Sequence, residues 1–256
     1  MNRCRLALFA ALIAALPVPL PSSELPPRIA IIIDDLGYEL DAGRRAIDLP
    51  GPLAYAILPA TPRGRTLAET AHLRGKEVLL HLPLQAVEHH DVVEPGGITL
   101  DMSHTGFRKA FAEALDSVPF AIGISGHRGS LLTRHPGHMQ WLMQEIRSRD
   151  GLFFVDSYTT HKSIALQIAN EAGVAAAKRD VFLDNDRSAQ SLAREFDRLK
   201  ALAERQGIAV AIGHPYPETL AFLERRLPTL ASDGFELIPI SEVLESFVEP
   251  ENAGML

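Results

Sequence analysis

The chain has 256 residues, of which 46% are hydrophobic and 22% are charged, and its formal net charge is −7. This composition is typical of a globular protein with enough apolar material for one large core. The acidic balance and the lack of a basic tract argue against a nucleic-acid partner. The single cysteine, Cys4, excludes an intrachain disulfide framework.

The first 23 residues differ from the rest of the chain. Arg3 and Arg5 precede an apolar run over residues 6–16, and a proline-rich stretch follows. This order is typical of a secretory signal peptide, and the run is short for a membrane span, which needs roughly 20 apolar residues. We therefore expect an exported protein of the periplasm or cell envelope. The alternative is an uncleaved anchor in residues 1–23 that associates the protein with the membrane.

Short apolar runs alternate with amphipathic stretches over residues 28–248, after a short linker at 24–27 and before a tail at 249–256. The predicted strands are 29–33, 53–58, 77–80, 120–124, 152–155, 174–177, 208–212 and 235–239. The predicted helices are 40–48, 64–74, 104–117, 136–149, 163–172, 188–206, 217–231 and 241–247. The strict alternation predicts a parallel α/β sheet, and the length favours a single barrel over two domains.

Ionisable residues stand at the ends of five predicted strands. Asp34 and Asp35 end the first, and later strands end at His81, His127, Asp156 and His214. Because the carboxyl ends of parallel strands meet at one rim, we expect these side chains to lie together. Two adjacent carboxylates beside a buried strand are costly unless a positive charge compensates them, and a divalent metal ion would do so.

Some of these residues also have a structural interpretation. Asp35 is placed to cap the following helix, and Asp156 is placed to form a turn. Asp184, in the stretch DVFLDNDRS, is a further candidate for the rim, although this stretch lacks the ligand spacing of an EF-hand. The combination of residues therefore predicts a site more strongly than any one of them.

Five stretches, taken together and in order, resemble one protein family. The stretches are AIIIDDLG, HLPLQ, GISGHRGS, FFVDS and AIGHPYPETL, and they resemble the divergent polysaccharide deacetylases. The resemblance extends over roughly residues 28–243. It implies a single distorted (β/α) barrel of the carbohydrate-esterase type, with a divalent metal ion, often zinc, at the carboxyl rim.

The resemblance also implies roles for individual residues. In the Asp-Asp pair, Asp34 corresponds to a catalytic base and Asp35 to a metal ligand. His81 corresponds to the first histidine of an H-x-x-x-H motif whose second position is occupied here by Gln85, so one usual ligand is missing. His127 is implied as the replacement ligand.

Other residues are implied around this centre. His214 resembles a late histidine that acts as the catalytic acid. Arg128 is matched to an arginine that an aspartate such as Asp156 would orient. Tyr38 lies near the predicted rim, where it is a candidate for packing against a sugar ring.

These residues predict a metal-dependent hydrolase that removes N-acetyl groups from an envelope polysaccharide or amino sugar. The missing histidine favours an alternative, a non-catalytic envelope module that binds glycan or a protein partner. A metal hydrolase for a phosphoester or peptide is a third interpretation. The chain contains no P-loop, H-E-x-x-H or G-x-S-x-G motif that would indicate other common activities.

Overall fold

The computed structural model describes residues 25–88 and 94–245. The signal or anchor expected at 1–23 and the tail expected at 249–256 lie outside these residues. Within them, no helix is both long enough and apolar enough to cross a membrane.

The fold is built on one parallel sheet of nine strands. In chain order these are β1 (Arg28–Leu36), β2 (Ala54–Ile57), β3 (Glu77–Leu84), β4 (Ala121–Arg128), β5 (Phe153–Asp156), β6 (Ala176–Lys178), β7 (Val181–Phe182), β8 (Ile208–Gly213) and β9 (Glu236–Leu237). Their order across the sheet is β6-β5-β4-β3-β2-β1-β8-β7, and β9 pairs with β1. All pairs are parallel, so the strands bring their carboxyl ends to the same rim.

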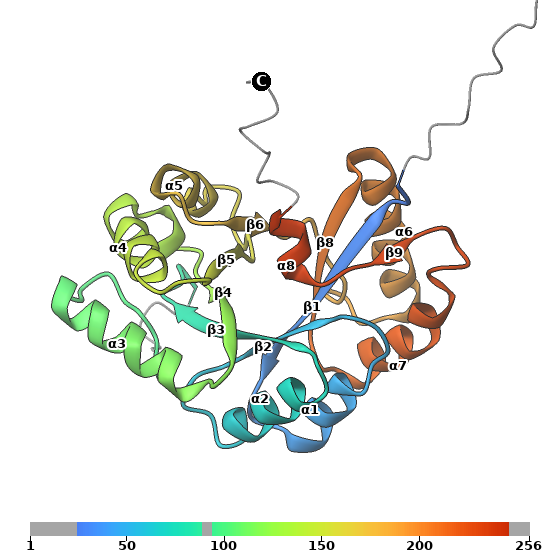
Figure 1. The fold of residues 1–256 in the computed structure, drawn as a ribbon, viewed down its shortest axis with the longest axis horizontal. Coiled ribbons are helices and arrows are strands. Elements are labelled where there is room, and N and C mark those ends of the chain that lie inside the picture. The colour runs from blue at the N-terminus through green and yellow to red at the C-terminus, as the bar shows by residue number, and fades with distance from the viewer. Residues whose placement is uncertain (1–24, 89–93, 246–256) are drawn as a thin grey trace, which may run out of the picture.

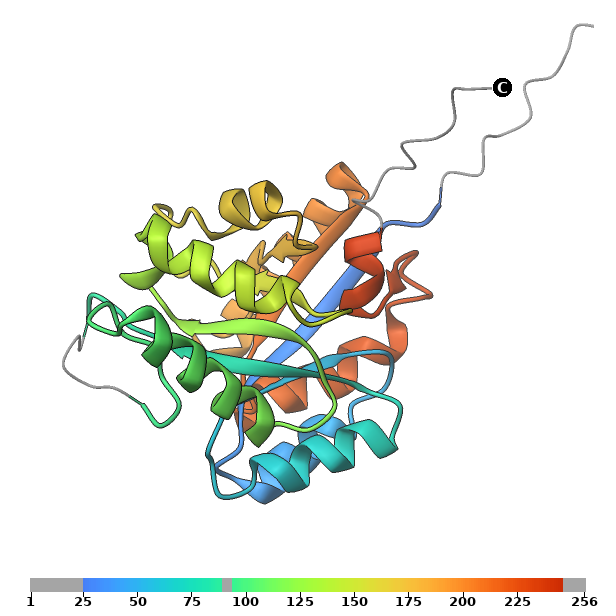
Figure 2. The same cartoon turned by 60° about the vertical axis from the view of Figure 1, so that its left-hand side comes forward.

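Helices cover the outside of the sheet. They are α1 (Leu40–Ile47), α2 (Gly64–Leu73), α3 (His104–Ser117), α4 (Pro136–Arg147), α5 (Ala165–Ala172), α6 (Ala189–Gln206), α7 (Pro217–Arg226) and α8 (Ile240–Glu245). The sheet curls into a half-barrel with α1 to α7 around it, while the short α8 lies at its inner side (Figure 1). The view turned by 60° shows the same arrangement (Figure 2). The predicted distorted (β/α) barrel is confirmed.

The two faces of β1 explain how this arrangement holds together. Ile29, Ile31 and Ile33 belong to the large core that includes residues of the outer helices, whereas Ala30 and Ile32 face the inner core. Successive side chains of a strand point to opposite faces, so a strand that is apolar throughout must be covered on both sides. The helices and α8 supply this cover.

The ends of several elements follow from local chemistry. Ser103 Oγ accepts a hydrogen bond from Gly106 N at 3.2 Å and caps the amino terminus of α3. Gly173 ends α5 with a positive φ of 67°, where a residue without a Cβ has no steric penalty. The helix predicted over 217–231 ends at Arg226 and continues as a 3-10 turn, Leu227–Thr229.

Two strands extend further than the sequence predicts. β3 and β4 reach Leu84 and Arg128, so His81 and His127 lie within strands and not after them. Their pairing continues to the end, with Pro83 opposite His127. The two-residue strand β7 is an additional element that its short apolar stretch does not predict.

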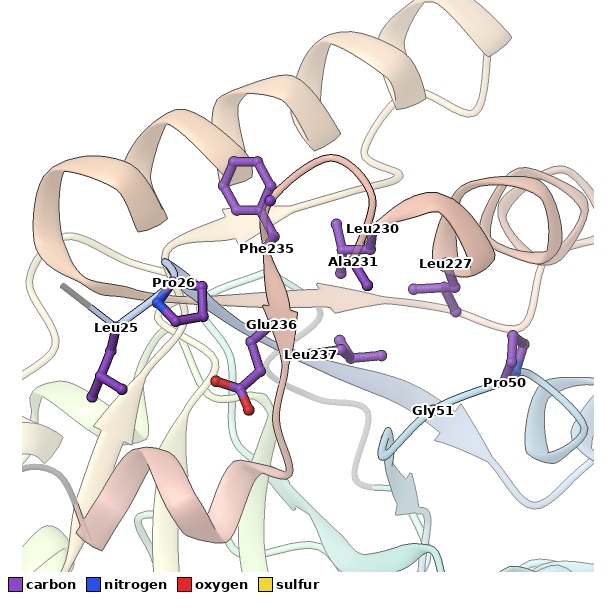
Figure 3. A pocket seen from close by; sticks show the side chains of 11 residues that line it. Leu25, Pro26, Pro50, Gly51, Leu227, Leu230, Ala231, Phe235, Glu236 and Leu237 are labelled. Carbon is purple, nitrogen blue, oxygen red and sulfur yellow. The ribbon is translucent and has the colours of Figure 1, made fainter. Parts of the chain in front are cut away.

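An apolar groove of about 680 Å³ lies at the amino-terminal end of the sheet (Figure 3). Its lining includes Leu25 and Pro26 before β1, and Phe235 and Leu237 beside β9. None of the predicted site residues lines it. The predicted site residues lie towards the carboxyl ends of the strands, at the opposite rim of the sheet. The volume of a cavity therefore does not identify the candidate site in this protein.

Candidate metal centre

Three predicted ligand residues converge at the carboxyl rim. Asp35 Oδ1 lies 3.2 Å from His81 Nε2 and 2.9 Å from His127 Nδ1. The two ring nitrogens lie 3.1 Å from each other. The three atoms thus form a small triangle contributed by β1, β3 and β4, which are brought together by the parallel register.

The donor set and its spacing fit a metal ion. Tetrahedral zinc with nitrogen and oxygen ligands at their usual bond lengths separates neighbouring ligand atoms by roughly 3.3 Å, close to the triangle here. Asp35 Oδ1 is in ion-pair range of both imidazoles, yet it accepts no well-directed hydrogen bond among the described residues. A carboxylate oxygen this close to two imidazole nitrogens, without a directed hydrogen bond to either, is in the arrangement expected around a cation. One carboxylate and two imidazoles leave a coordination position open to water or substrate.

The backbone brings Asp35 to this triangle by an unusual conformation. Its φ is +61°, and Arg128, which follows His127, has a φ of +58°. Residues with a Cβ rarely adopt positive φ, and such strain gathers at functional sites. At Asp35, the register between β1 and β2 also shifts, between Ile33 and Leu36.

Asp34 lies beneath the triangle and is 2% exposed. Its Oδ2 is 3.6 Å from His81 Nε2, whereas its Oδ1 has no hydrogen-bond partner among the described residues. Burial raises the pKa of Asp34, and the neighbouring histidines only partly offset this effect. A carboxylate with a raised pKa is a stronger base, which suits the predicted proton acceptor.

His214 lies on the other side of Asp35, just after β8. Its Nδ1 donates to Asp184 Oδ1 at 2.8 Å, and its backbone N–H donates to Asp184 Oδ2 at 2.7 Å. Its Nε2 is 3.8 Å from Asp35 Oδ2. Burial lowers the pKa of His214, but Asp184, together with Asp35 and Asp34, more than compensates and the pKa rises to about 9. His214 therefore carries a proton at neutral pH and presents Nε2 to the site.

Charge within the triangle is balanced between Asp35 and the histidines. Burial raises the pKa of Asp35, but its interactions with His127 and His81 outweigh burial and hold that pKa well below its usual range. Burial lowers the pKa of His127, but Asp35 and Glu94 reverse this and raise it. Without a metal ion, the site is thus an ionised carboxylate surrounded by imidazoles.

Comparison with known sequences agrees with this geometry. The sequence model described as "Divergent polysaccharide deacetylase" matches residues 31–244. The chain belongs to the divergent polysaccharide deacetylase family. The family resemblance predicted from the motifs is confirmed.

Proteins similar to this chain match it over most of its length. The "Uncharacterized protein YibQ" of Escherichia coli (strain K12) is 34% identical over 250 residues, which cover 96% of this chain and 76% of that protein. The crystal structure of the uncharacterized protein ATU2773 from Agrobacterium tumefaciens C58 has a TM-score of 0.82 at 21% identity, covering 87% and 91% of the two chains. BA3943 of Bacillus anthracis, a CE4 family pseudoenzyme, has a TM-score of 0.51 at 12% identity, covering 86% of this chain and 66% of that one. The two solved structures establish the shared fold.

Two residues predicted to act together are separated in this deacetylase-like site. Arg128 Nη2 pairs with Glu94 Oε1 at 3.0 Å, not with Asp156. The Asp156 oxygens accept hydrogen bonds from Tyr158 N at 2.8 Å and from Ser163 Oγ at 2.7 Å. The expected orientation of Arg128 by Asp156 is therefore wrong, because the backbone turn after β5 engages that carboxylate.

Two other predicted residues have contacts of their own. Gln85 Oε1 accepts a hydrogen bond from Leu100 N at 2.8 Å. Tyr38 is half-exposed and lines a small cavity of about 190 Å³ together with Asp35, His214 and Tyr216. Tyr38 is thus placed to contact a ligand that binds at the rim.

The structure adds residues that sequence reasoning missed or underrated. Glu94 reaches His127 from a loop that has no motif. Asp184 was only a candidate for the rim, yet it is the partner of His214. Arg179 donates to Ser157 O at 2.6 Å and to Tyr158 O at 2.8 Å, and its pKa falls to about 10 mainly because it is desolvated. Of these three residues, only Asp184 carries a signal in the sequence, because it ends a short apolar run as the other rim residues do.

Proposed function

We propose that this protein is a zinc-dependent hydrolase that removes N-acetyl groups from a glycan of the cell envelope. The observation that supports it most is the convergence of Asp35, His81 and His127 between a buried carboxylate and a protonated histidine. A site that only binds glycan has no need of a base and an acid beside a cation site. Membership of the deacetylase family supports the same conclusion.

In this proposal, Asp35, His81 and His127 hold the metal ion. A divalent metal bound there would polarise the amide carbonyl and lower the pKa of a water molecule. Asp34 accepts a proton from the water that attacks the carbonyl carbon, and its raised pKa makes it an effective base. Burial of Asp34 keeps bulk water away from this carboxylate.

His214 completes the reaction by protonating the amine that leaves. Since Asp184 holds Nδ1, the proton available to the substrate is the one on Nε2, which faces Asp35. The pKa of about 9 keeps this nitrogen protonated at neutral pH in the metal-free protein. The amide C–N bond breaks, and the products are acetate and a free amino group on the sugar.

We also propose that the protein acts outside the cytoplasm, on an envelope glycan. Arg3 and Arg5 before the apolar run at 6–16 support export, and the lack of any cysteine after Cys4 suits an oxidising compartment. Exposed Tyr38 and partly exposed Tyr216 flank the site and suit packing against a sugar ring.

Acetate release is the direct test. Zinc-loaded protein is incubated with N-acetylglucosamine oligomers and with peptidoglycan, and acetate is measured by an enzyme-coupled assay. Release by the wild type, with a loss of about 10²–10⁴-fold in Asp34→Asn, supports the proposal. Glu113→Gln, on an exposed face of α3, is the control and retains activity. No release from any acetylated glycan by zinc-loaded wild type would contradict it.

A second function is favoured by one observation. Gln85 stands where the second histidine of the H-x-x-x-H motif is expected, and it is engaged with Leu100 instead. A module that binds envelope glycan without hydrolysing it is consistent with this substitution. The same fold occurs in BA3943, described as a pseudoenzyme, and in a mutant of it described as having restored activity. Binding of acetylated glycan by zinc-loaded protein that releases no acetate would favour this module.

A further inference from the structure

Glu94 contacts a ring nitrogen of His127 that the ligand triangle does not use. Its Oε2 lies 3.1 Å and its Oε1 lies 3.2 Å from His127 Nε2. Its side chain is 20% exposed, and Arg128 Nη2 lies 3.0 Å from Oε1. His127 therefore stands between two carboxylates, with Asp35 at Nδ1 and Glu94 at Nε2.

This arrangement determines which nitrogen of His127 is free to bind a cation. An ionised carboxylate only accepts hydrogen bonds, and Glu94 also forms an ion pair with the guanidinium of Arg128. Nε2 must then keep its hydrogen and donate it to Glu94. In the neutral ring the lone pair lies on Nδ1, which faces Asp35 Oδ1 and His81 Nε2.

The two histidines of the triangle differ in this respect. His81 Nδ1 has no hydrogen-bond partner among the described residues, so no polar contact on the far side of that ring orients it. His127 is more exposed than His81, with 14% of its side chain accessible against 3%. His127 is thus the more exposed of the two rings, and it is also the one whose second nitrogen contacts a carboxylate, that of Glu94.

The segment that carries Glu94 is hydrogen-bonded to the end of β3. Gln85 N donates to Ile98 O at 2.9 Å, and Ile98 N donates to Pro83 O at 2.9 Å. The Gln85 side chain accepts from Leu100 N, and Gly97 N donates to Glu94 O at 2.9 Å. The residue that replaces the expected histidine thus anchors the segment that carries Glu94.

We infer that Glu94 is a positioning residue that fixes the tautomer and the orientation of His127 for metal binding, on a loop that Gln85 holds in place. This inference rests on the metal site of the proposed function. A carboxylate on the far nitrogen of a ligating histidine raises the basicity of the ligand and typically contributes 10–100-fold to metal affinity.

Zinc affinity of the full chain, measured by competition with a chromophoric chelator, tests the inference. Glu94→Ala weakens zinc binding by about 10–100-fold, and Glu94→Gln by less, because an amide oxygen still accepts from Nε2–H. Glu88→Gln is the matched control: this carboxylate lines a small cavity together with Arg128 and accepts a hydrogen bond from Ser130 Oγ. It removes the same charge and leaves the affinity within about twofold of wild type.

Nitrogen-15 shifts of the His127 ring separate positioning from a merely structural role. In zinc-bound wild type, Nε2 carries the hydrogen and Nδ1 the metal, whereas Glu94→Ala loses this fixed tautomer. Wild-type zinc affinity in folded Glu94→Ala, or zinc bound through Nε2, would overturn the inference. Wild type that binds no zinc would overturn it together with the proposed function. Zinc binding that depends on Glu94 without acetate release would refute the hydrolase alone.

Discussion

Asp184 holds His214 through both its carboxylate oxygens, one on the ring Nδ1 at 2.8 Å and one on the backbone N–H at 2.7 Å. Thr219 Oγ1 also donates to Oδ2 at 2.8 Å, so the carboxylate is fixed from α7 as well. The carboxylate is fully buried, and its charge is directed at a single imidazole. Asp184 is therefore the residue that raises the pKa of His214 most.

Asp184→Asn should lower the pKa of His214 from about 9 towards its ordinary value near 6.5. The amide keeps a hydrogen-bonding group in place but removes the negative charge that favours the imidazolium. Titration of the histidine ring resonances by NMR in chelator-treated protein measures this, with His214→Gln used to assign the signal. An unchanged pKa in Asp184→Asn would show that Asp34 and Asp35 hold the proton instead.

The same shift predicts a pH dependence of folding. The pKa of His214 is raised in the folded state, so its contribution to stability is complete below about pH 6.5 and is lost as pH rises through about 9. The shift corresponds to roughly 3 kcal/mol at most. Urea unfolding of metal-free protein should show wild type losing stability relative to Asp184→Asn over this interval. Parallel curves for the two proteins would contradict the assignment.

The ligand set predicts a loss of metal from single substitutions. Wild type should contain near one equivalent of zinc by elemental analysis, and His127→Ala or Asp35→Asn should lose most of it, since two protein ligands rarely retain zinc. His135→Ala is a matched control, because this histidine caps α4 and lies outside the triangle. Full zinc content in both ligand variants would rule out this site.

Much of the fold was predictable because it follows from periodicity. Runs such as residues 29–33 are apolar on both faces, and this pattern requires a sheet that is covered on both sides. Once the strands are parallel, the meeting of Asp35, His81 and His127 at one rim follows from geometry. For this reason a cluster of ionisable residues at the rim was predictable from residues far apart in the chain, whereas the choice of these three as ligands came from the family resemblance.

Contacts made by loops were not predictable in the same way. Glu94 belongs to no motif, and only the bonds of Ile98 and Leu100 to the end of β3 place it on His127. Arg128 and Asp156 end neighbouring strands, but the turn after β5 engages Asp156. Such pairings depend on local turn conformation, which strand periodicity does not determine.

Gln85→His should not raise zinc affinity, although it recreates the H-x-x-x-H pattern. The Gln85 side chain accepts a hydrogen bond from Leu100 N, and the triangle of Asp35, His81 and His127 already supplies three ligand atoms. The substitution also removes an anchor of the segment that carries Glu94. We expect a zinc affinity equal to or weaker than that of wild type in chelator competition. Tighter binding would show that position 85 reaches the metal.

Asp34→Asn should stabilise the metal-free protein while it removes activity. Burial raises the pKa of Asp34, so at neutral pH the folded state contains a carboxylate that is costly to ionise, and one of its oxygens has no partner among the described residues. If Asp34→Asn raises the free energy of unfolding by about 1 kcal/mol, the melting temperature rises by about 2–4 °C for a chain of this size. The gain should shrink as pH falls, because a group with a raised pKa loses its stabilising contribution only as pH rises. Melting curves of both proteins in chelator at pH 5 and pH 8 check this. A gain equal at the two pH values would mean that the pKa of Asp34 is not raised in the folded protein, because only a difference between the folded and unfolded pKa values makes the gain depend on pH.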